Sequence, residues 1–411
     1  MWRGWSEVDE TVSFSRNGVV EGELRMDLEF SEEESELRDN VRAVLASICP
    51  PAVVRAVYEG KGNAASVWAT MVDLSWPALA ISEEHGGLGM GFVEVAIVAE
   101  ELGRAVVPSP FLATVTQFAP AVRELGGDGP LGADLLGRVA AGESTGTVAL
   151  AEGGRWEPSA VGATAGETAD GWVLNGAKVA VLDGADADEV MVIARAAGTS
   201  GTEGLGAFVV PRSGLAATSR TVVDPTLPLA DLVLDGLLVP PDRVLAAPGT
   251  AGVADALDRA GHEATVALAT ATVGACRAIF EQTVEYAKVR EQYGRPIGSF
   301  QALKHRMADM YLAVERATSL CYFASLTIAE EDPRRAEAAS MAKAAAGECQ
   351  RLVVQDGLQL HGGIGMTWEQ DLHFLLKRAL SGDALYGDAV HHRARLARML
   401  GLAPLVEEAR A

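Results

Sequence analysis

Hydrophobic and polar positions alternate differently in three successive regions of the chain. From about residue 31 to residue 141, apolar residues recur at the spacing of an amphipathic helix. The segment 92–105 shows this most clearly, with apolar residues at Val93, Ile97, Val98 and Leu102. Ser31 followed by Glu34 is the signature of a capping box, so we expect the first helix to begin there. The first region is predicted to be helical.

The second region, from about residue 144 to residue 245, has a sequence pattern typical of β-strands. Short apolar runs are separated by Gly, Asp, Asn and Pro, and the runs are 146–152, 171–182, 189–195, 206–211 and 229–240. Asn175-Gly176 is a dipeptide typical of two-residue hairpin turns, and we expect such a turn there. The pattern predicts a small antiparallel β domain.

The third region, from about residue 249 to the end, is helical again. Its segment 264–290 is long, Ala-rich and periodic, and small residues on long helices allow the close packing of a bundle. Ser299 is expected to cap the next helix and Pro333 to start a third. Further helices are expected from Trp368 to about Leu380 and from 390 to 400.

The predicted fold class is therefore α+β and multidomain: an N-terminal α-helical domain, a middle antiparallel β domain and a C-terminal four-helix bundle. The expected boundaries are 26–143, 144–247 and 248–411. Residues 1–25 are interpreted as a tail, or as a misassigned start, because Met26 opens the first periodic segment. This N-terminal stretch has no apolar core of a signal peptide, so a cytoplasmic location is expected.

Composition narrows the possible functions. The chain of 411 residues carries 34 basic and 56 acidic residues, a formal net charge of -22, which disfavours binding to nucleic acid. No run of 18 apolar residues is present, so no membrane-spanning helix is expected. Cys49, Cys276, Cys321 and Cys349 are far apart without metal-binding spacing. They are expected to be reduced structural residues, and no metal site is predicted.

Two motifs in the third region carry candidate chemistry. The first is REQYGRPIGSFQALKHRMADM, 290–310, where an arginine at a helix end beside a Gly-Pro loop could contact a phosphate. The second is QLHGGIGMTWE, 359–369, whose adjacent glycines let backbone N–H groups approach a diphosphate. Taken alone, the first also fits an ordinary turn and the second a helix C-cap. Neither is the glycine pattern of a Rossmann fold.

Together the two motifs resemble the acyl-CoA dehydrogenase family. The family pattern is R-x-Q-F/Y-G-x-P-I-x-x-F-Q, then A-D-M, then Q-x-x-G-G-x-G-x-x-x-E. The matching residues are Arg290, Gln292, Tyr293, Gly294, Pro296, Ile297, Phe300 and Gln301, then Ala308, Asp309 and Met310, and later Gln359, Gly362, Gly363, Gly365 and Glu369. The segment 83–105 is similar to the family's P-E-x-x-G-G-x-G stretch and E-E-L-G helix. The resemblance spans nearly the whole chain from Met26.

The resemblance implies FAD held between the middle and C-terminal domains with help from a neighbouring subunit. It implies that Arg290, Gln292 and Tyr293 approach the FAD diphosphate and adenosine, with Phe300 and Gln301 nearby. It implies that Gln359, Leu360, Gly362 and Gly363 meet the FAD of the partner subunit. The implied reaction is α,β-oxidation of an acyl-CoA, in which a carboxylate removes the α-proton. The implied electron acceptor is an electron-transferring flavoprotein.

The sequence departs from the family where the catalytic base is expected. The family keeps a glutamate in I-Y-E-G-T-x-x-x-x-R, and residues 384–393 read ALYGDAVHHR. A gapless alignment places Tyr386 at the glutamate position, and a shift of one residue places Gly387 there; neither is a suitable base at neutral pH. Some members carry the glutamate on the preceding long helix, at about Ala264 here. Its neighbour Glu263, about 100° away around a helix, is a candidate base, and Asp388 is a weaker one.

The middle domain departs as well. The family's T-E-P-x-x-G-S is AEGGRWEPSA at 151–160, and its flavin-contacting W-I-T is Ala180-Val181-Leu182. Backbone contacts from Leu150 and Ala151 could survive, whereas the side chains against the flavin ring are lost. We therefore expect the contacts from the Arg290 and Gly362 motifs to be better kept than ring binding in this chain's own middle domain.

These departures leave several hypotheses. The first is a subunit of a heterotetrameric dehydrogenase, similar to bacterial relatives that act on steroid side-chain CoA esters, in which an unlike partner supplies the base. The second is a self-sufficient homotetramer that uses Glu263. The third is a flavin-dependent monooxygenase on the same fold, which needs no carboxylate base. The fourth is a pseudoenzyme that serves as a scaffold.

Overall fold

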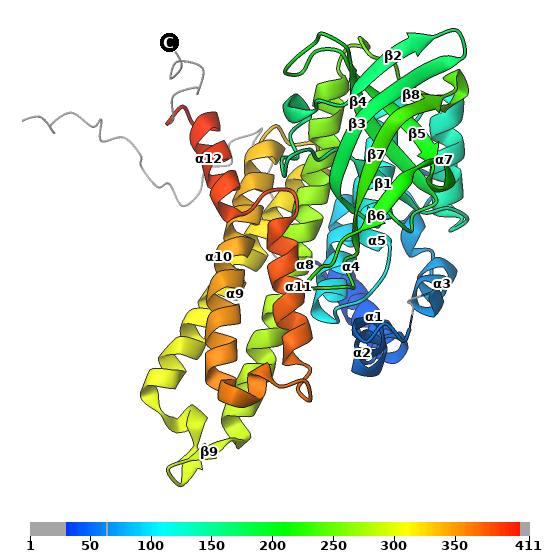
Figure 1. Cartoon of the computed structure of the whole chain (residues 1–411). Helices are drawn as coiled ribbons and strands as arrows, with labels where there is room; N and C mark the ends of the chain where they lie inside the picture. Colours follow the sequence, from blue (N-terminus) through cyan, green and yellow to red (C-terminus); the bar gives the residue numbers. More distant parts are fainter. Residues whose placement is uncertain (1–29, 63–64, 403–411) are drawn as a thin grey trace, which may run out of the picture.

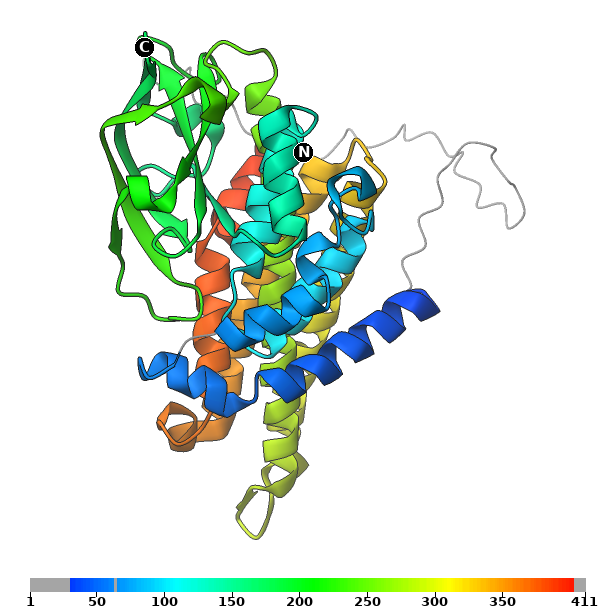
Figure 2. The ribbon, with the colours of Figure 1, turned by 90° about the vertical axis from the view of Figure 1, so that its right-hand side faces the viewer.

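A computed structural model describes residues 30–62 and 65–402 (Figure 1). The interpretations of residues 1–25 and of Met26 as the start lie outside this part. N-terminal helices are followed by a β-sheet and then by a bundle of long helices, which confirms the predicted α+β organisation. The N-terminal helices lie across one side of the bundle, and the sheet lies against one end of it (Figures 1 and 2).

The N-terminal region forms where helical periodicity predicted it. Its elements are α1 (Glu32–Ile48), α2 (Pro51–Tyr58), α3 (Ala65–Asp73), α4 (Phe92–Arg104), α5 (Phe111–Ala113), α6 (Ala119–Gly126) and α7 (Pro130–Ala140), with a π-helical turn (Thr114–Phe118) between α5 and α6. The predicted capping box is confirmed: the Glu34 N–H donates to Ser31 Oγ at 3.1 Å, and the Ser31 N–H donates to Glu34 Oε2 at 2.7 Å. This pair satisfies two of the free N–H groups at the start of α1.

In the described part of the chain, eight strands form one sheet in the order β6-β7-β3-β2-β4-β5-β8, with β1 beside β4. The strands are β1 (Gly146–Ala149), β2 (Thr164–Thr168), β3 (Gly171–Leu182), β4 (Glu189–Ala196), β5 (Leu205–Pro211), β6 (Ala216–Ser219), β7 (Leu229–Val239) and β8 (Val244–Ala246). Most neighbours are antiparallel, but β1 and β2 both run parallel to β4. The prediction of a purely antiparallel domain is corrected to a mixed sheet.

The predicted hairpin turn at Asn175-Gly176 is wrong. Both residues lie inside β3, and β2 turns into β3 earlier, at residues 169–170. The pairing of β3 with β7 slips between Leu174 and Gly176, which is a β-bulge. Gly176 has φ 142°, and a Cβ there would stand 2.8 Å from Ala163 Cβ. The glycine therefore serves a bulge and a close strand approach rather than a turn.

The C-terminal bundle is built around one long central helix. The elements are α8 (Val253–Val289), the β9–β10 hairpin (Glu291–Gln292 and Arg295–Pro296), α9 (Gln301–Ala329), α10 (Arg335–His361), α11 (Leu372–Ala384) and α12 (Ala389–Met399). Helix α8 packs against α4, α9, α10 and α11. Three predicted helix starts are corrected. Ser299 lies in a 3-10 turn and α9 begins at Gln301, α10 begins two residues after Pro333, and α11 begins at Leu372 rather than at Trp368.

The core contains an apolar helix of membrane-spanning length and the four cysteines. Helix α8 is long and apolar enough to cross a membrane, but 89% of its apolar window is buried within the protein, as in the core helix of a bundle. The α1–α2 pair passes the same test only if it is taken as one span bent by 58°. Cys49, Cys276, Cys321 and Cys349 are free, as predicted, and all four are buried.

Candidate active site and cofactor-contacting surface

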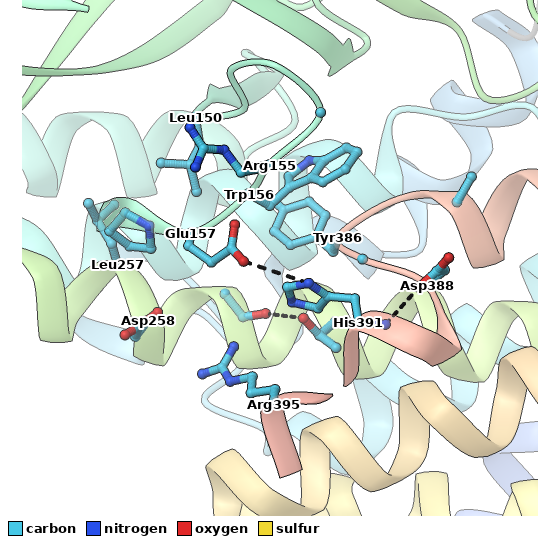
Figure 3. A pocket seen from close by; sticks show the side chains of 16 residues that line it. Leu150, Arg155, Trp156, Glu157, Leu257, Asp258, Tyr386, Asp388, His391 and Arg395 are labelled. Atoms are coloured by element: carbon cyan, nitrogen blue, oxygen red, sulfur yellow. Dashed lines mark hydrogen bonds and ion pairs between the residues drawn. The ribbon is translucent and has the colours of Figure 1, made fainter. Parts of the chain in front are cut away.

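A cavity of about 360 Å³ lies where the middle domain meets the C-terminal bundle. The loop 150–158 after β1, the first turns of α8 and the α11–α12 turn form its walls (Figure 3). Its lining residues are Leu150, Gly154, Arg155, Trp156, Glu157, Pro158, Leu257, Asp258, Gly261, Thr265, Ala384, Tyr386, Gly387, Asp388, His391 and Arg395. The cavity thus contains the segment 384–393 in which the sequence lacks the expected glutamate.

The buried Lys343 of α10 holds the α11–α12 turn in place. Its ammonium donates to the carbonyl oxygens of Gly382 at 3.1 Å, Asp383 at 2.7 Å and Gly387 at 2.8 Å. Burial lowers the pKa of Lys343 to about 8. The turn needs this support because Tyr386 and Gly387 both have left-handed backbones, with φ 57° and 88°. The result is a fixed turn that carries the Tyr386 side chain inward.

Tyr386 does not offer a base at this position. Its hydroxyl donates to Gln117 Oε1 at 3.3 Å, and its ring stacks on Trp156 with centroids 6.2 Å apart. Burial raises the pKa of the Tyr386 phenol above its ordinary value, so the hydroxyl keeps its proton at neutral pH. Gly387 has no side chain, and Asp388 is the N-cap of α12, where its Oδ1 accepts from the His391 N–H at 2.8 Å. Neither of the two positions aligned with the family's glutamate, Tyr386 and Gly387, therefore carries a carboxylate.

The loop 150–158 is fastened on both sides. Lys178, fully buried in β3, donates to Glu152 Oε1 at 2.5 Å and to the Leu150 carbonyl at 3.3 Å. At the other end, Glu157 Oε1 lies 3.6 Å from His391 Nδ1 across the cavity, as the dashed line in Figure 3 shows. Between these anchors, Trp156 points inward onto Tyr386 (Figure 3).

The slot where the resemblance places a flavin ring is nearly filled. A second cavity of only about 10 Å³ lies against Ala180, Val181 and Leu182. Its other lining residues are Gln117, Val148, Ala151, Trp156, Val179, Leu385 and Tyr386. Such a volume holds about one water molecule. The residues present therefore do not fit a flavin ring in this chain's own middle-domain slot.

Glu263 faces away from the cavity. Two residues along a helix correspond to a rotation of about 200°, so Glu263 lies opposite Gly261 and Thr265, which line the cavity. Its carboxylate is buried, 2.5 Å from Arg123 Nη2 and 3.6 Å from Arg335 Nη2. Burial raises the pKa of Glu263, and the Arg123 charge opposes that effect. Its burial and its pairing with Arg123 argue against the predicted role of Glu263 as the base.

Asp258 is the α8 carboxylate that lines the cavity, and sequence reasoning missed it. Burial raises the pKa of Asp258, and the nearby Arg395 charge lowers it. The Arg395 guanidinium lies on the facing helix α12 and donates to His262 Nε2 at 3.3 Å. Burial lowers the pKa of His262 to about 3, so this imidazole is neutral. Asp258 is three residues before Gly261 and therefore lies on the same side of α8. The sequence alone does not indicate that this side of the helix lines the cavity.

The Arg290 motif lies at the opposite end of α8. Arg290 follows the helix, and the β9–β10 hairpin carries Tyr293 at its tip, with a left-handed backbone and 93% of its surface exposed. Tyr293 packs edge-on against Phe300, and the Arg295 guanidinium lies 4.2 Å from the Phe300 ring centre. Within the part of the chain that the structure describes, Arg290 has no ion pair. We call residues 290–301 the tip.

The Gly362 motif joins the tip at the same end of the bundle (Figure 1). His361, the last residue of α10, stacks on Tyr286 of α8 with ring centroids 4.5 Å apart. Gln359, Gly362 and Gly363 are exposed, whereas Leu360 is buried in the core. The predicted contact from Leu360 is thus possible only through its backbone. Apart from Leu360 and the half-buried Phe300, the predicted FAD-contacting residues of both motifs are exposed.

The tip and the cavity are too far apart to act on one small molecule within a single chain. At a rise of about 1.5 Å per residue, Arg290 lies about 48 Å along α8 from Asp258. Because α8 is a continuous helix, no side chain motion brings the two ends together. Arg290 at the tip is exposed, and an exposed arginine can pair with a phosphate group.

Comparison with known proteins decides the family. Residues 31–143 match the model of the acyl-CoA dehydrogenase N-terminal domain, and residues 250–401 match that of the C-terminal domain. The acyl-CoA dehydrogenase IpdE2 of Mycobacterium tuberculosis is 34% identical over 350 residues, covering 85% of this chain and 91% of that protein. This chain belongs to the acyl-CoA dehydrogenase family. Members of the family are flavoproteins and oxidoreductases that act on CH–CH bonds.

Solved structures agree with the assignment of the fold. A chain of the ChsE4-ChsE5 complex from Mycobacterium tuberculosis superposes with a TM-score of 0.81 at 27% identity, over 92% of this chain and 100% of that one. A chain of the Tcur3481-Tcur3483 steroid acyl-CoA dehydrogenase, in a G363A variant, gives a TM-score of 0.78 at 29% identity, over 92% and 99%. Both structures contain two differently named chains.

Proposed function

We propose that this chain is one subunit of an FAD-dependent acyl-CoA dehydrogenase that oxidises an acyl-CoA thioester to its enoyl-CoA. An unlike partner subunit supplies the catalytic base, and an electron-transferring flavoprotein is the acceptor. The observation that carries the proposal is the separation of about 48 Å between the tip and the cavity. Surfaces that cannot meet within one chain can meet only in an assembly.

The tip supplies binding groups for FAD held in the partner's middle domain. Arg290 brings a charge that can pair with a phosphate, and the exposed Gly362 and Gly363 have no side chain to keep a ligand from the backbone. The exposed Tyr293 ring offers a surface on which a base can stack. When bound, FAD supplies the acceptor for the hydride that leaves the substrate.

None of the three positions at which a base was expected offers one to this cavity. Removing the weakly acidic α-proton of a thioester requires a base within hydrogen-bonding distance. Tyr386 keeps its proton, Asp388 caps α12, and Glu263 is paired with Arg123 on the far side of α8. These placements favour a partner base over a self-sufficient enzyme that uses Glu263.

The relatives support an unlike partner and a bulky substrate. IpdE2 is the curated relative with 34% identity, and both superposed structures come from complexes of two differently named chains. One of these is described as a steroid dehydrogenase. A steroid-derived acyl-CoA is therefore the substrate class we propose to test first.

The test begins with the chain purified alone and after co-expression with a candidate partner of the same family. We expect little flavin absorbance and no turnover from the chain alone, and a yellow, active, larger assembly from the pair. Stoichiometric FAD and full turnover from the chain alone would contradict the proposal.

Two variants of the pair sharpen the test. Arg290→Ala should lower FAD retention, whereas Lys288→Ala should retain FAD, because Lys288 is a nearby exposed cation already paired with Glu285. Glu263→Gln should keep both FAD and turnover, and its melting temperature is recorded because a buried ion pair is changed. Loss of turnover with FAD retained would favour Glu263 as the base instead.

A further inference from the structure

Trp156 and Tyr386 form the wall between the two cavities of the candidate active site. Both residues line the cavity of about 360 Å³, and both line the cavity of about 10 Å³ against Ala180 and Leu182. Their rings are stacked at 28° with centroids 6.2 Å apart. The small cavity is thus the remainder of a larger slot that two aromatic side chains fill.

We propose that Trp156 is a plug that excludes a planar flavin ring from this chain's own slot. The residue acts as a specificity determinant, because it decides which subunit of a pair can hold the ring. The inference rests on the proposed function, since excluding the ring matters only where a partner holds it. Tyr386 is the second half of the plug.

The geometry of the loop keeps the plug in place. Glu152 is tied to the buried Lys178, and it also accepts from the N–H groups of Gly162 at 2.7 Å and Ala163 at 3.0 Å. Glu157, directly after Trp156, faces His391 on α12. The Glu152 contacts therefore fix the loop on the N-terminal side of the indole, and on its other side Glu157 approaches α12 at 3.6 Å. Protein interiors are close-packed, so a ring cannot enter beside it.

The walls behind the plug suit a planar ring with carbonyl groups. Val179, Ala180 and Leu182 offer apolar surface against which the face of a ring could pack. Gln117 comes from the π-helical turn between α5 and α6 and is only 3% exposed. Its Nε2 has no hydrogen-bond partner among the described residues. A buried donor of this kind is costly unless an acceptor arrives, and a flavin ring carries carbonyl acceptors.

Replacing the indole should therefore join the two cavities and open the slot. Trp156→Ala removes the plug, and Trp156→Leu keeps apolar volume but loses the flat ring. Trp172→Ala is the matched control, because Trp172 is also half-buried in the middle domain but packs against Phe208, away from the slot. Circular dichroism and melting temperature establish that each variant is folded.

The experiment titrates the isolated chain with lumiflavin, the flavin ring without a ribityl phosphate, and follows quenching of its fluorescence. Trp156→Ala should bind lumiflavin at least about tenfold more tightly than wild type and Trp172→Ala, with Trp156→Leu in between. The inference is overturned if wild type binds as tightly as Trp156→Ala. It is also overturned if folded Trp156→Ala and Trp156→Leu bind no better than Trp172→Ala. No partner, acyl-CoA or turnover enters this measurement, so a failed partner requirement would leave its result unchanged.

Discussion

The Arg378–Asp224 ion pair ties the three regions of the molecule together. Arg378 of α11 donates through Nε to Asp224 Oδ2 at 2.7 Å, and through Nη2 to Thr226 Oγ1 at 2.6 Å and the Val107 carbonyl at 3.0 Å. Tyr58 of α2 donates its hydroxyl to Asp224 Oδ1 at 3.0 Å. Arg378 is 1% exposed and Asp224 is 0% exposed. The cluster thus joins the helical domain, the sheet domain and the bundle without access to water.

Arg378→Met tests what this cluster contributes. Methionine fills much of the arginine's volume, but the Asp224 carboxylate is left buried with only Tyr58 and Thr226 as donors. Removing one partner of a buried pair typically costs about 3–5 kcal/mol, because the remaining charge is uncompensated. Arg220→Met is the control, since the Arg220–Asp231 pair is 43% and 37% exposed and pairs of that kind contribute about 0–1 kcal/mol.

Urea unfolding followed by tryptophan fluorescence and by circular dichroism measures both variants. Two probes are needed because a multidomain chain need not unfold in one step. The reasoning is refuted if Arg378→Met loses no more stability than Arg220→Met. A further check is Asp224→Asn in the Arg378→Met background, which should recover part of the loss because it removes the uncompensated charge.

Two further predictions concern stability. Burial raises the pKa of Asp183 to about 8 from an ordinary value of 3.8. Between these two pH values the folded chain holds a proton that the unfolded chain has released. The free energy of unfolding therefore falls as the pH rises from about 4 to about 8. Asp183→Asn should remove this pH dependence and raise the free energy of unfolding at high pH by up to about 1.4 kcal/mol for each unit of pKa shift. If urea unfolding between pH 5 and 8.5 shows the same pH dependence for the wild type and the variant, the prediction is contradicted. Gly274→Ala should sharply lower the melting temperature, because its Cβ would stand 2.0 Å from the Glu100 carbonyl oxygen. Gly261→Ala has open space around its Cβ and should add about 0.5–1 kcal/mol; equal effects at both glycines would refute the packing argument.

Local sequence signals predicted the helices well and the sheet only in part. The capping box at Ser31 and the apolar spacing of 92–105 act over a few residues, so the sequence alone specifies α1 and α4. Asn175-Gly176 is an equally local signal, but the pairing of β3 with β2 and β7 overrides it. The parallel pairing of β1 and β2 with β4 depends on contacts distant in sequence, for which the chain shows no local pattern.

The tip was easier to find from the sequence than the cavity. Arginine, glycine and aromatic residues at fixed spacing form a contiguous motif, and 290–301 does fold as one exposed unit. The cavity is assembled from three distant segments, so the inward orientation of Trp156 depends on the tertiary path of the loop 150–158. Lys343 did carry a signal that sequence reasoning passed over. A single lysine among alanines on a core helix has to find buried acceptors, here three carbonyl oxygens.

The two ends of α8 differ in what surrounds them. At its N-terminal end lie Glu263 and, from the α11–α12 turn, Tyr386; at its C-terminal end lies the exposed tip. Glu263 pairs with Arg123 of α6 and approaches Arg335 of α10, so its charge holds neighbouring helices and is not available to a substrate. At the same end of α8, Tyr386 and Trp156 fill the slot that a flavin ring would need. At the other end, Arg290, Tyr293 and Gly362 remain exposed. A symmetric assembly of this chain would repeat the filled slot in every subunit and leave every tip without a flavin to contact, whereas an unlike partner with an open slot gives the tip a function.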